Sequence, residues 1–288
     1  MISPTPPISP TPLTTLPTIL PTTAPGIPPT IPPDAPPATP PTVPPAAPPT
    51  IPPTVPPEVP PAGPPPPPVA SHKLEADGIQ LQFGERKILQ DIYLLCETGR
   101  ITGLLGRNGQ GKTCLMNIIY GSLPVETKSI RIDHQSYPKA FKRPDLLVYL
   151  PQFHFIPGSL TLKRLFPDFG LDFGDFEKRF PEFSRLYRSR IRQLSGGQRR
   201  LTEVYLIARS PSRFAMLDEP FSHLMPLHVD TMIEILAEEK KHKGILITDH
   251  LYRPIVSCAD RLYVLSNGKT RLAKKMDDLA ELGYLPVD

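Results

Sequence analysis

An α/β domain with a parallel sheet at its core is predicted for residues 71–288. Short apolar segments, which are typical of buried strands, alternate there with longer segments in which apolar residues recur at helical spacing. This alternation favours parallel strands joined by crossover helices. Alternating polar and apolar residues near residue 80 and an Asn-Gly turn near residue 267 add antiparallel strands, which predict an antiparallel β-subdomain.

Residues 1–70 differ from the rest of the chain in composition. They hold 31 of the 43 prolines, no aromatic residue, no Lys or Arg, and only Asp34 and Glu58 as charges. Such a segment cannot bury enough apolar surface to offset about 1–2 kcal/mol of backbone ordering per residue. We therefore predict a disordered, proline-rich N-terminal tail with local polyproline II geometry. An inert extension or a wrongly chosen start codon is favoured over a spacer or partner-binding role, because no basic residue flanks the prolines.

The composition of the remaining residues excludes several classes of protein. They carry all 32 Lys and Arg and 26 of the 28 acids, an excess too small to indicate a nucleic-acid partner. Their apolar runs fall far short of the roughly 20 residues that span a bilayer. The three cysteines share no C-x-x-C spacing, so neither a disulfide framework nor a zinc site is indicated, and a reducing cytosol is the simplest setting. No secretory signal is expected.

The elements are predicted in chain order. Residues 79–97 alternate apolar and polar residues around turn residues 84–87, which predicts an antiparallel hairpin. A later segment contains Pro157, Pro167 and Pro181 and predicts a short, irregular, mostly helical subdomain at about 153–194. The other expected elements are strands at 101–106, 214–220 and 244–250, helices at 112–121 and 228–243, and a hairpin about Asn267-Gly268.

The loop "GRNGQGKT" fits the pattern G-x-x-x-x-G-K-[ST] between a predicted strand and a predicted helix. In such a loop, glycines let backbone N–H groups turn toward phosphate oxygens at a helix N-terminus. Lys112 is then expected to reach the β- and γ-phosphates, and the Thr113 hydroxyl to ligate Mg²⁺. The alternative is a tight glycine turn that caps a buried helix. The predicted nucleotide-binding residues of this loop are Gly106, Asn108, Gly109, Gly111, Lys112, Thr113 and Cys114.

The segment "LSGGQ" predicts the start of another helix. Ser195 followed by Gln198 three residues later is a capping box, which leaves helix N–H groups exposed beside two glycines. Such a helix tip is a second site for an anion, although an ordinary capped helix explains the motif alone.

An apolar strand ends in the acids of "MLDEP". Carboxyl ends of parallel strands face the crevice in which ligands bind. Asp218 is therefore expected to hold a magnesium-bound water, and Glu219 to act as general base toward an attacking water. A solvated acidic pair is the alternative.

In order and spacing, "GRNGQGKT", "LSGGQ" and "MLDEP" resemble the motifs of the ATP-binding cassette (ABC) family of P-loop NTPases over nearly all of residues 73–275. The resemblance implies ATP and Mg²⁺ as cofactors and places further residues in the site. Phe83 falls where an aromatic ring stacks on adenine, with core packing as the alternative. Gln152 falls where a glutamine contacts Mg²⁺, and His250 where a histidine contacts the γ-phosphate.

In the family, two cassettes pair head to tail. Ser195, Gly197 and Gln198 would then address ATP held by a second subunit, so a homodimer is expected. The resemblance also implies a separate membrane permease and a cytoplasmic location at the inner face of the plasma membrane. The segments "DEPF" and "ITDH" most resemble those of the family branch that contains branched-chain amino-acid importers and lipopolysaccharide exporters.

The chain departs from the family after "DEP", because Met225 stands where the family has an aspartate that couples the two sites. The ring-bearing residues Phe153, His154 and Phe155, directly after Gln152, are expected either to be exposed in the family's partner groove or to pack inside the insert. The arginines at 185, 188, 190 and 192 are expected on a solvated helix face, with a membrane surface or an acidic partner as the alternative. The favoured function is the ATP-hydrolysing subunit of a transporter, and the alternatives are a soluble ABC-type ATPase switch and a regulatory module with little turnover.

Overall fold

A six-stranded sheet forms the centre of the domain. The computed structural model describes residues 71–273, 278 and 279, so the predicted proline-rich tail lies outside the described residues. The strand order is β12-β11-β5-β10-β9-β8, and all neighbours are parallel except the β11–β12 hairpin about Asn267-Gly268. The strands are β5 (Ile101–Leu105), β8 (Leu147–Leu150), β9 (Phe214–Asp218), β10 (Gly244–Thr248), β11 (Arg261–Ser266) and β12 (Lys269–Ala273).

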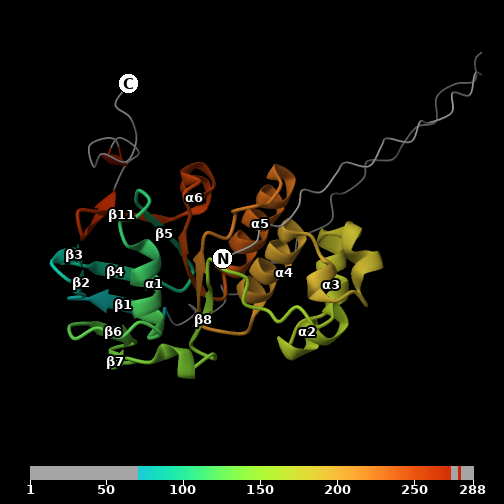
Figure 1. Cartoon of the computed structure of the whole chain (residues 1–288), viewed down its shortest axis with the longest axis horizontal. Coiled ribbons are helices and arrows are strands. Elements are labelled where there is room, and N and C mark those ends of the chain that lie inside the picture. Colours follow the sequence, from blue (N-terminus) through green and yellow to red (C-terminus); the bar gives the residue numbers. More distant parts are fainter. Residues whose placement is uncertain (1–70, 274–277, 280–288) are drawn as a thin grey trace, which may run out of the picture. The chain divides into compact units, whose positions relative to one another are not determined.

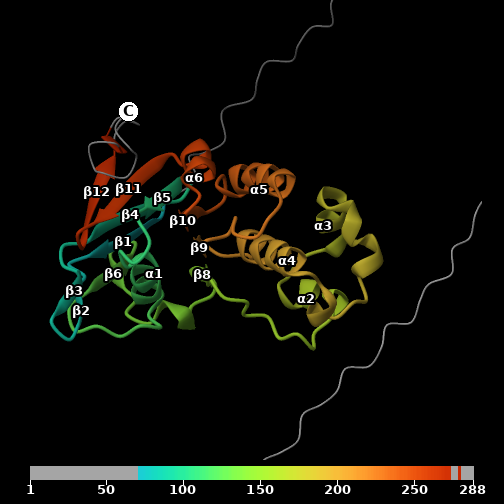
Figure 2. The same ribbon diagram turned by 45° about the horizontal axis from the view of Figure 1, so that its top comes forward.

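Helices and a second sheet cover the two faces of the central sheet (Figures 1 and 2). In β5, Ile101 and Leu105 pack in the core shared with α4 (Gly196–Arg209), α5 (Pro226–Glu239) and α6 (Tyr252–Cys258). Leu104 points to the other core, which contains α1 (Lys112–Tyr120) and the antiparallel strands. Burial on both faces explains why β5, β9 and β10 are almost continuously apolar in sequence.

The antiparallel β-subdomain is more extensive than predicted. Its sheet has the order β4-β1-β6-β7, and β2 and β3 form a separate hairpin about Gly84-Glu85. The expected hairpin over 79–97 is therefore correct only for its first half. The amides of Gln90 and Asp91 donate to Gly268 O, at 2.8 and 3.3 Å, so the chain turns away and β4 pairs with β1 instead. These strands are β1 (Lys73–Asp77), β2 (Leu81–Phe83), β3 (Arg86–Leu89), β4 (Tyr93–Glu97), β6 (Ser129–Ile132) and β7 (Gln135–Ser136).

The insert after β8 is built from short helices, as the sequence predicts. The side chains of Thr161 and Asp172 cap α2 and α3 by accepting backbone N–H groups. The arginines at 185, 188, 190 and 192 are exposed, as predicted, but they do not share one helix face. They lie on 3-10 helices and the loops between them. The elements are α2 (Leu162–Asp168), α3 (Phe173–Arg179) and the 3-10 helices η2 (Pro181–Leu186) and η3 (Ile191–Gln193), while η1 (Ala140–Lys142) precedes β8.

Helix α5 begins two residues earlier than predicted and ends four residues earlier. Pro226 suits the first helical turn because its fixed φ matches the helix and its missing N–H has no partner to lose there. After α5, the buried ammonium of Lys243 donates to Ala208 O and Ser210 O at 2.7 Å each and lies 3.1 Å from Glu239. The Lys243 contacts fix the carboxyl end of α4. Among the described residues, none of the helices has both the length and the apolar character to cross a bilayer.

The aromatic core of the insert should contribute strongly to stability. Phe176 is fully buried, and its ring lies 4.7–5.9 Å from five other aromatic rings, including Tyr205 of α4. We expect Phe176→Ala to lower the free energy of unfolding by about 3–5 kcal/mol, because it removes buried area and leaves a cavity. Chemical denaturation measures the change. Phe141→Ala, at a ring that is 40% exposed, is the control with a smaller loss, and equal losses would contradict the assignment.

Candidate functional site

The glycine-rich loop lies between the end of β5 and the start of α1. Gly109 and Gly111 have φ angles of 79° and 97°, a region that residues with a side chain rarely adopt. At Gly106, a Cβ atom would lie 2.8 Å from Leu265 O, so this position also requires glycine. Because the helix N-cap is Gly111, which has no side chain to cap the helix, the first amides of α1 remain available to an anion.

Lys112 is held inside this loop. Its ammonium donates to Gly106 O at 2.7 Å and to Arg107 O at 3.5 Å, and the residue is only 6% exposed. Burial lowers its pKa, while the nearby carboxylates of Glu219, Asp218 and Asp249 oppose that shift. The loop thus presents amides and a positive charge to the same space.

Asp218 lies opposite this loop, at the carboxyl end of β9. It is fully buried, and the Tyr149 hydroxyl donates to its Oδ2 atom at 3.1 Å. Its Oδ1 atom has no hydrogen-bond partner among the described residues. Burial raises the pKa of Asp218, and the Thr113 and Tyr149 side chains oppose that rise. A buried carboxylate oxygen without a partner, close to the Thr113 hydroxyl, fits a hydrated Mg²⁺ ion.

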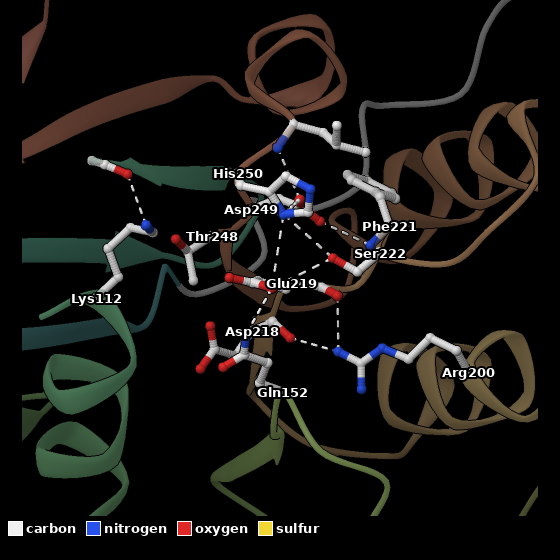
Figure 3. Close-up of polar contacts among 12 residues, drawn as sticks. Lys112, Gln152, Arg200, Asp218, Glu219, Phe221, Ser222, Thr248, Asp249 and His250 are labelled. Atoms are coloured by element: carbon white, nitrogen blue, oxygen red, sulfur yellow. Dashed lines mark hydrogen bonds and ion pairs between the residues drawn. The ribbon is translucent and has the colours of Figure 1, made fainter. Parts of the chain in front are cut away.

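The next residue has a strained backbone. Glu219 has φ = 51°, which is uncommon for a residue with a side chain. Its amide donates to Thr248 O at 2.7 Å, and the guanidinium of Arg200 donates to the carbonyls of Asp218 and Glu219 at 2.6 and 2.9 Å (Figure 3). Long-range bonds from two elements therefore fix where the Glu219 side chain points.

Two other predicted site residues, Gln152 and His250, lie close to the Glu219 carboxylate. Gln152 Nε2 donates to Glu219 Oε2 at 2.8 Å, and His250 Nδ1 lies 3.8 Å from the same oxygen (Figure 3). The Ser222 hydroxyl lies 3.5 Å from both Glu219 Oε2 and His250 Nδ1. The ends of β8, β9 and β10 thus bring together residues that are far apart in sequence.

Asp249 belongs to the site although its sequence motif did not predict a role for it. It is fully buried and accepts the amides of Phe221 and Leu251 at 3.0 and 2.9 Å, and it lies 3.2 Å from His250 Nδ1. Burial raises its pKa, which those two backbone bonds oppose. The carboxylate fixes the loops that follow β9 and β10, and the acid of "ITDH" was its signal in the sequence.

Lys112, Gln152, Glu219 and His250 line a cavity of about 580 Å³. Phe83 is 57% exposed at its edge, so core packing does not explain this aromatic residue. Arg86, which pairs with Phe83 in the β2–β3 hairpin, adds a second cation that the sequence analysis missed. The lining residues are Phe83, Arg86, Ile88, Asn108, Gly109, Gly111, Lys112, Thr113, Cys114, Gln152, Glu219 and His250.

The "LSGGQ" segment does not line this cavity. Ser195 is exposed at the tip of α4, where its hydroxyl accepts from the Gln198 amide at 3.2 Å and its amide donates to Gln198 Oε1 at 2.9 Å. The predicted capping box is therefore confirmed. Gly197 must be glycine, because a Cβ atom there would lie 2.8 Å from His223 O.

Comparison with known proteins agrees with this geometry. The family model described as "ABC transporter" matches residues 89–222. A probable ABC transporter ATP-binding protein of Azorhizobium caulinodans is 32% identical over 70% of this chain and 77% of its own length. The chain belongs to the ATP-binding subunits of ABC transporters. The lipopolysaccharide export system ATP-binding protein LptB of Haemophilus influenzae is 28% identical over 68% of this chain and 88% of its own length.

Solved structures show the same fold for this ABC subunit. A structure titled as the ATP-binding subunit of an ABC transporter has a TM-score of 0.62 at 23% identity, and it covers 75% of this chain and 95% of the other. A nucleotide-free ATP-binding cassette gives a TM-score of 0.59 at 22% identity, with coverage of 75% and 96%. As a member of this family, the chain is an ATP-hydrolysing P-loop ATPase.

Met225 changes the start of α5 in this ABC ATPase. It occupies the N-cap, where the described residues show no side-chain cap, and it is 60% exposed beside Leu227, which is 72% exposed. Polar residues such as Asp are preferred at an N-cap because they accept the free helix amides. Met225 therefore leaves the first amides of α5 without a side-chain acceptor.

The aromatic residues after Gln152 divide between two environments. Phe153 is 70% exposed, whereas Phe155 is partly buried against the core. His154, between them, is exposed as well, so only Phe155 packs against the core. Cys114, one of the residues predicted to bind nucleotide, is half-buried and lines the cavity.

Removing the loop lysine should abolish nucleotide binding by this ABC ATPase. In Lys112→Ala, no ammonium remains between the loop carbonyls and the cavity, so we expect ATP affinity to fall by about a hundredfold or more, as for the loss of a buried charge-assisted contact. Titration calorimetry measures the affinity. Lys241→Ala, at an exposed lysine in the turn after α5, should bind ATP normally, and unchanged affinity in Lys112→Ala would disprove the assignment.

Proposed function

We propose that two copies of this ABC ATPase close on ATP, with each nucleotide between the phosphate loop of one copy and the Ser195 tip of the other. The main support is that the α4 tip offers an exposed, capped helix N-terminus but does not line the cavity of its own chain. A tip with free amides suits an anion. A phosphate group of ATP held by a second copy would accept hydrogen bonds from these amides. Closure of the two copies on ATP then acts as a two-state switch.

Within each site, the residues have distinct proposed roles. The loop amides and Lys112 bind the β- and γ-phosphates, and Phe83 stacks on the adenine. Thr113, Asp218 and Gln152 hold Mg²⁺, which when bound neutralises phosphate charge. Residues 106–114 together surround the triphosphate.

Glu219 is the proposed general base for hydrolysis. Because Gln152 donates to its Oε2 atom, the Oε1 atom is left to accept a proton from the attacking water. His250, 3.8 Å from the same carboxylate, is placed to donate to the γ-phosphate. The strained backbone at Glu219 then serves to aim the carboxylate.

We also propose a separate membrane permease as partner, which places the subunit at the cytoplasmic face of the membrane. The supporting observations are the exposed Phe153 ring directly after Gln152 and the names of curated relatives, several of which are lipopolysaccharide export ATP-binding proteins. An exposed aromatic ring beside a nucleotide-contacting residue suits an interface that reports on the site.

The pairing can be tested with a variant that binds ATP but does not hydrolyse it. In Glu219→Gln the amide cannot accept a proton, so we expect turnover to fall at least about a hundredfold while ATP affinity stays near normal. With ATP and magnesium the variant should form a stable dimer, measured by size-exclusion chromatography with light scattering. A strictly monomeric variant would contradict the proposed pairing.

The permease can be tested by gentle purification of the tagged chain from its own membranes. We expect a multi-spanning protein to co-purify, and Phe153→Ala to weaken this association without changing ATPase turnover in solution. Phe141→Ala is the matched control. Recovery of only non-membrane partners would favour the soluble ATPase switch instead.

A further inference from the structure

The β2–β3 hairpin has a cavity on each of its two faces. It forms a two-stranded sheet of its own at one edge of the domain (Figures 1 and 2). Because side chains alternate across a strand, successive cross-strand pairs face opposite sides. The pair of Phe83 and Arg86 lines the nucleotide cavity, whereas the pair of Gln82 and Lys87 lines a second cavity of about 550 Å³. We call this second space the hairpin cavity.

Apolar side chains make up part of the lining of the hairpin cavity. Leu81 and Leu89 come from the hairpin itself and are only 8% and 1% exposed. Pro124 and Val125 come from the loop that joins α1 to β6. Both the volume and the apolar content of this space are typical of small-molecule sites.

Two opposite charges line the same cavity. Lys87 comes from β3 and Glu126 from the loop after α1, and both side chains are exposed. Within the part of the chain that the structure describes, neither of them forms an ion pair. The side chains of Gln80, Gln82 and Gln90 add hydrogen-bond donors and acceptors. A ligand that carries both a carboxylate and an ammonium group would satisfy both charges.

We propose that the hairpin cavity binds a small zwitterion with an apolar side chain, namely an apolar α-amino acid. The carboxylate of the ligand pairs with Lys87 and its ammonium with Glu126, while its side chain covers Leu81 and Leu89. A simple anion would instead be repelled by Glu126, and a simple cation by Lys87. The arrangement of charges therefore selects a zwitterion over either ion alone.

A ligand in the hairpin cavity also acts on the nucleotide cavity, because the same two strands separate them. A two-stranded hairpin is marginally stable alone, and this one is held at its ends by bonds from Gln80 N to Thr127 O at 3.1 Å and from Gln90 N to Gly268 O at 2.8 Å. Contacts on its second face stabilise the strands that carry Phe83. Occupancy thus tightens ATP binding, and ATP tightens binding of the amino acid by the same factor. This linkage rests on the proposed stacking of Phe83 on adenine.

The binding test uses the full chain without nucleotide and L-phenylalanine as the probe. Titration calorimetry should show saturable binding with a Kd of about 1 mM or lower, as two charge-assisted contacts and one apolar contact predict. Hydrocinnamate, which lacks the ammonium, and phenethylamine, which lacks the carboxylate, should each bind about tenfold more weakly or worse. Lys87→Met and Glu126→Gln should each weaken L-phenylalanine binding to a similar extent. Lys142→Met, at an exposed lysine of η1, is the control.

The linkage test measures ATP affinity with and without saturating L-phenylalanine. We expect the amino acid to raise ATP affinity about fivefold or more. In Phe83→Ala, L-phenylalanine should still bind but should no longer change ATP affinity, because the ring that contacts adenine is gone. Unchanged ATP affinity in the unmodified chain would disprove the linkage.

Absence of saturable L-phenylalanine binding would overturn the proposed site. Equally tight binding of either single-charge analogue would also overturn it, as would unchanged binding in Lys87→Met or Glu126→Gln, since the probe would then lie elsewhere. Lys112→Ala is expected to lose ATP binding but should bind L-phenylalanine normally. The amino-acid site is therefore tested separately from the proposed ATP-driven pairing, and each proposal can fail without the other.

Discussion

The buried guanidinium of Arg200 is the interaction on which the site depends. It bonds to carbonyls at the end of β8 and at the end of β9, and it belongs to the helix that begins at Ser195. A left-handed backbone at a residue such as Glu219 costs about 1–3 kcal/mol and persists only where surrounding bonds fix it. A buried cation in turn requires acceptors. The strained backbone of Glu219 and the buried guanidinium of Arg200 therefore stabilise each other.

The parts of the site that the sequence predicted are those determined by neighbouring residues. The glycine loop has its required conformations at Gly109 and Gly111, and the capping box of α4 joins residues three positions apart. Apolar strands ending in acids predicted where Asp218 and Glu219 would lie. In each case, local backbone geometry or a strand end is enough to place the side chain.

The features of the fold and site that were not predicted from the sequence depend on contacts between distant segments. Arg86 reaches the cavity only through its register with Phe83, and the pairing of β4 with β1 depends on where Gln90 bonds to the β11–β12 turn. Asp249 gains its role from the amide of Phe221, 28 residues away in the chain. No periodicity in the sequence encodes such pairings, so they emerge only when the sheet is assembled.

The anchoring of α4 by Lys243 decides which kind of motion this helix can make. The ammonium holds the carbonyls of Ala208 and Ser210 at the far end of the helix, while Ser195 at the near end is exposed. A helix of 14 residues is about 21 Å long at 1.5 Å per residue. A tilt of roughly 5° about this end displaces the tip by about 2 Å, close to two-thirds of a hydrogen-bond length, and shifts the Arg200 bonds to the ends of β8 and β9 by less. Under the proposed pairing, small angular changes at the base are thus sufficient to make or break the contact of the tip with the partner's ATP.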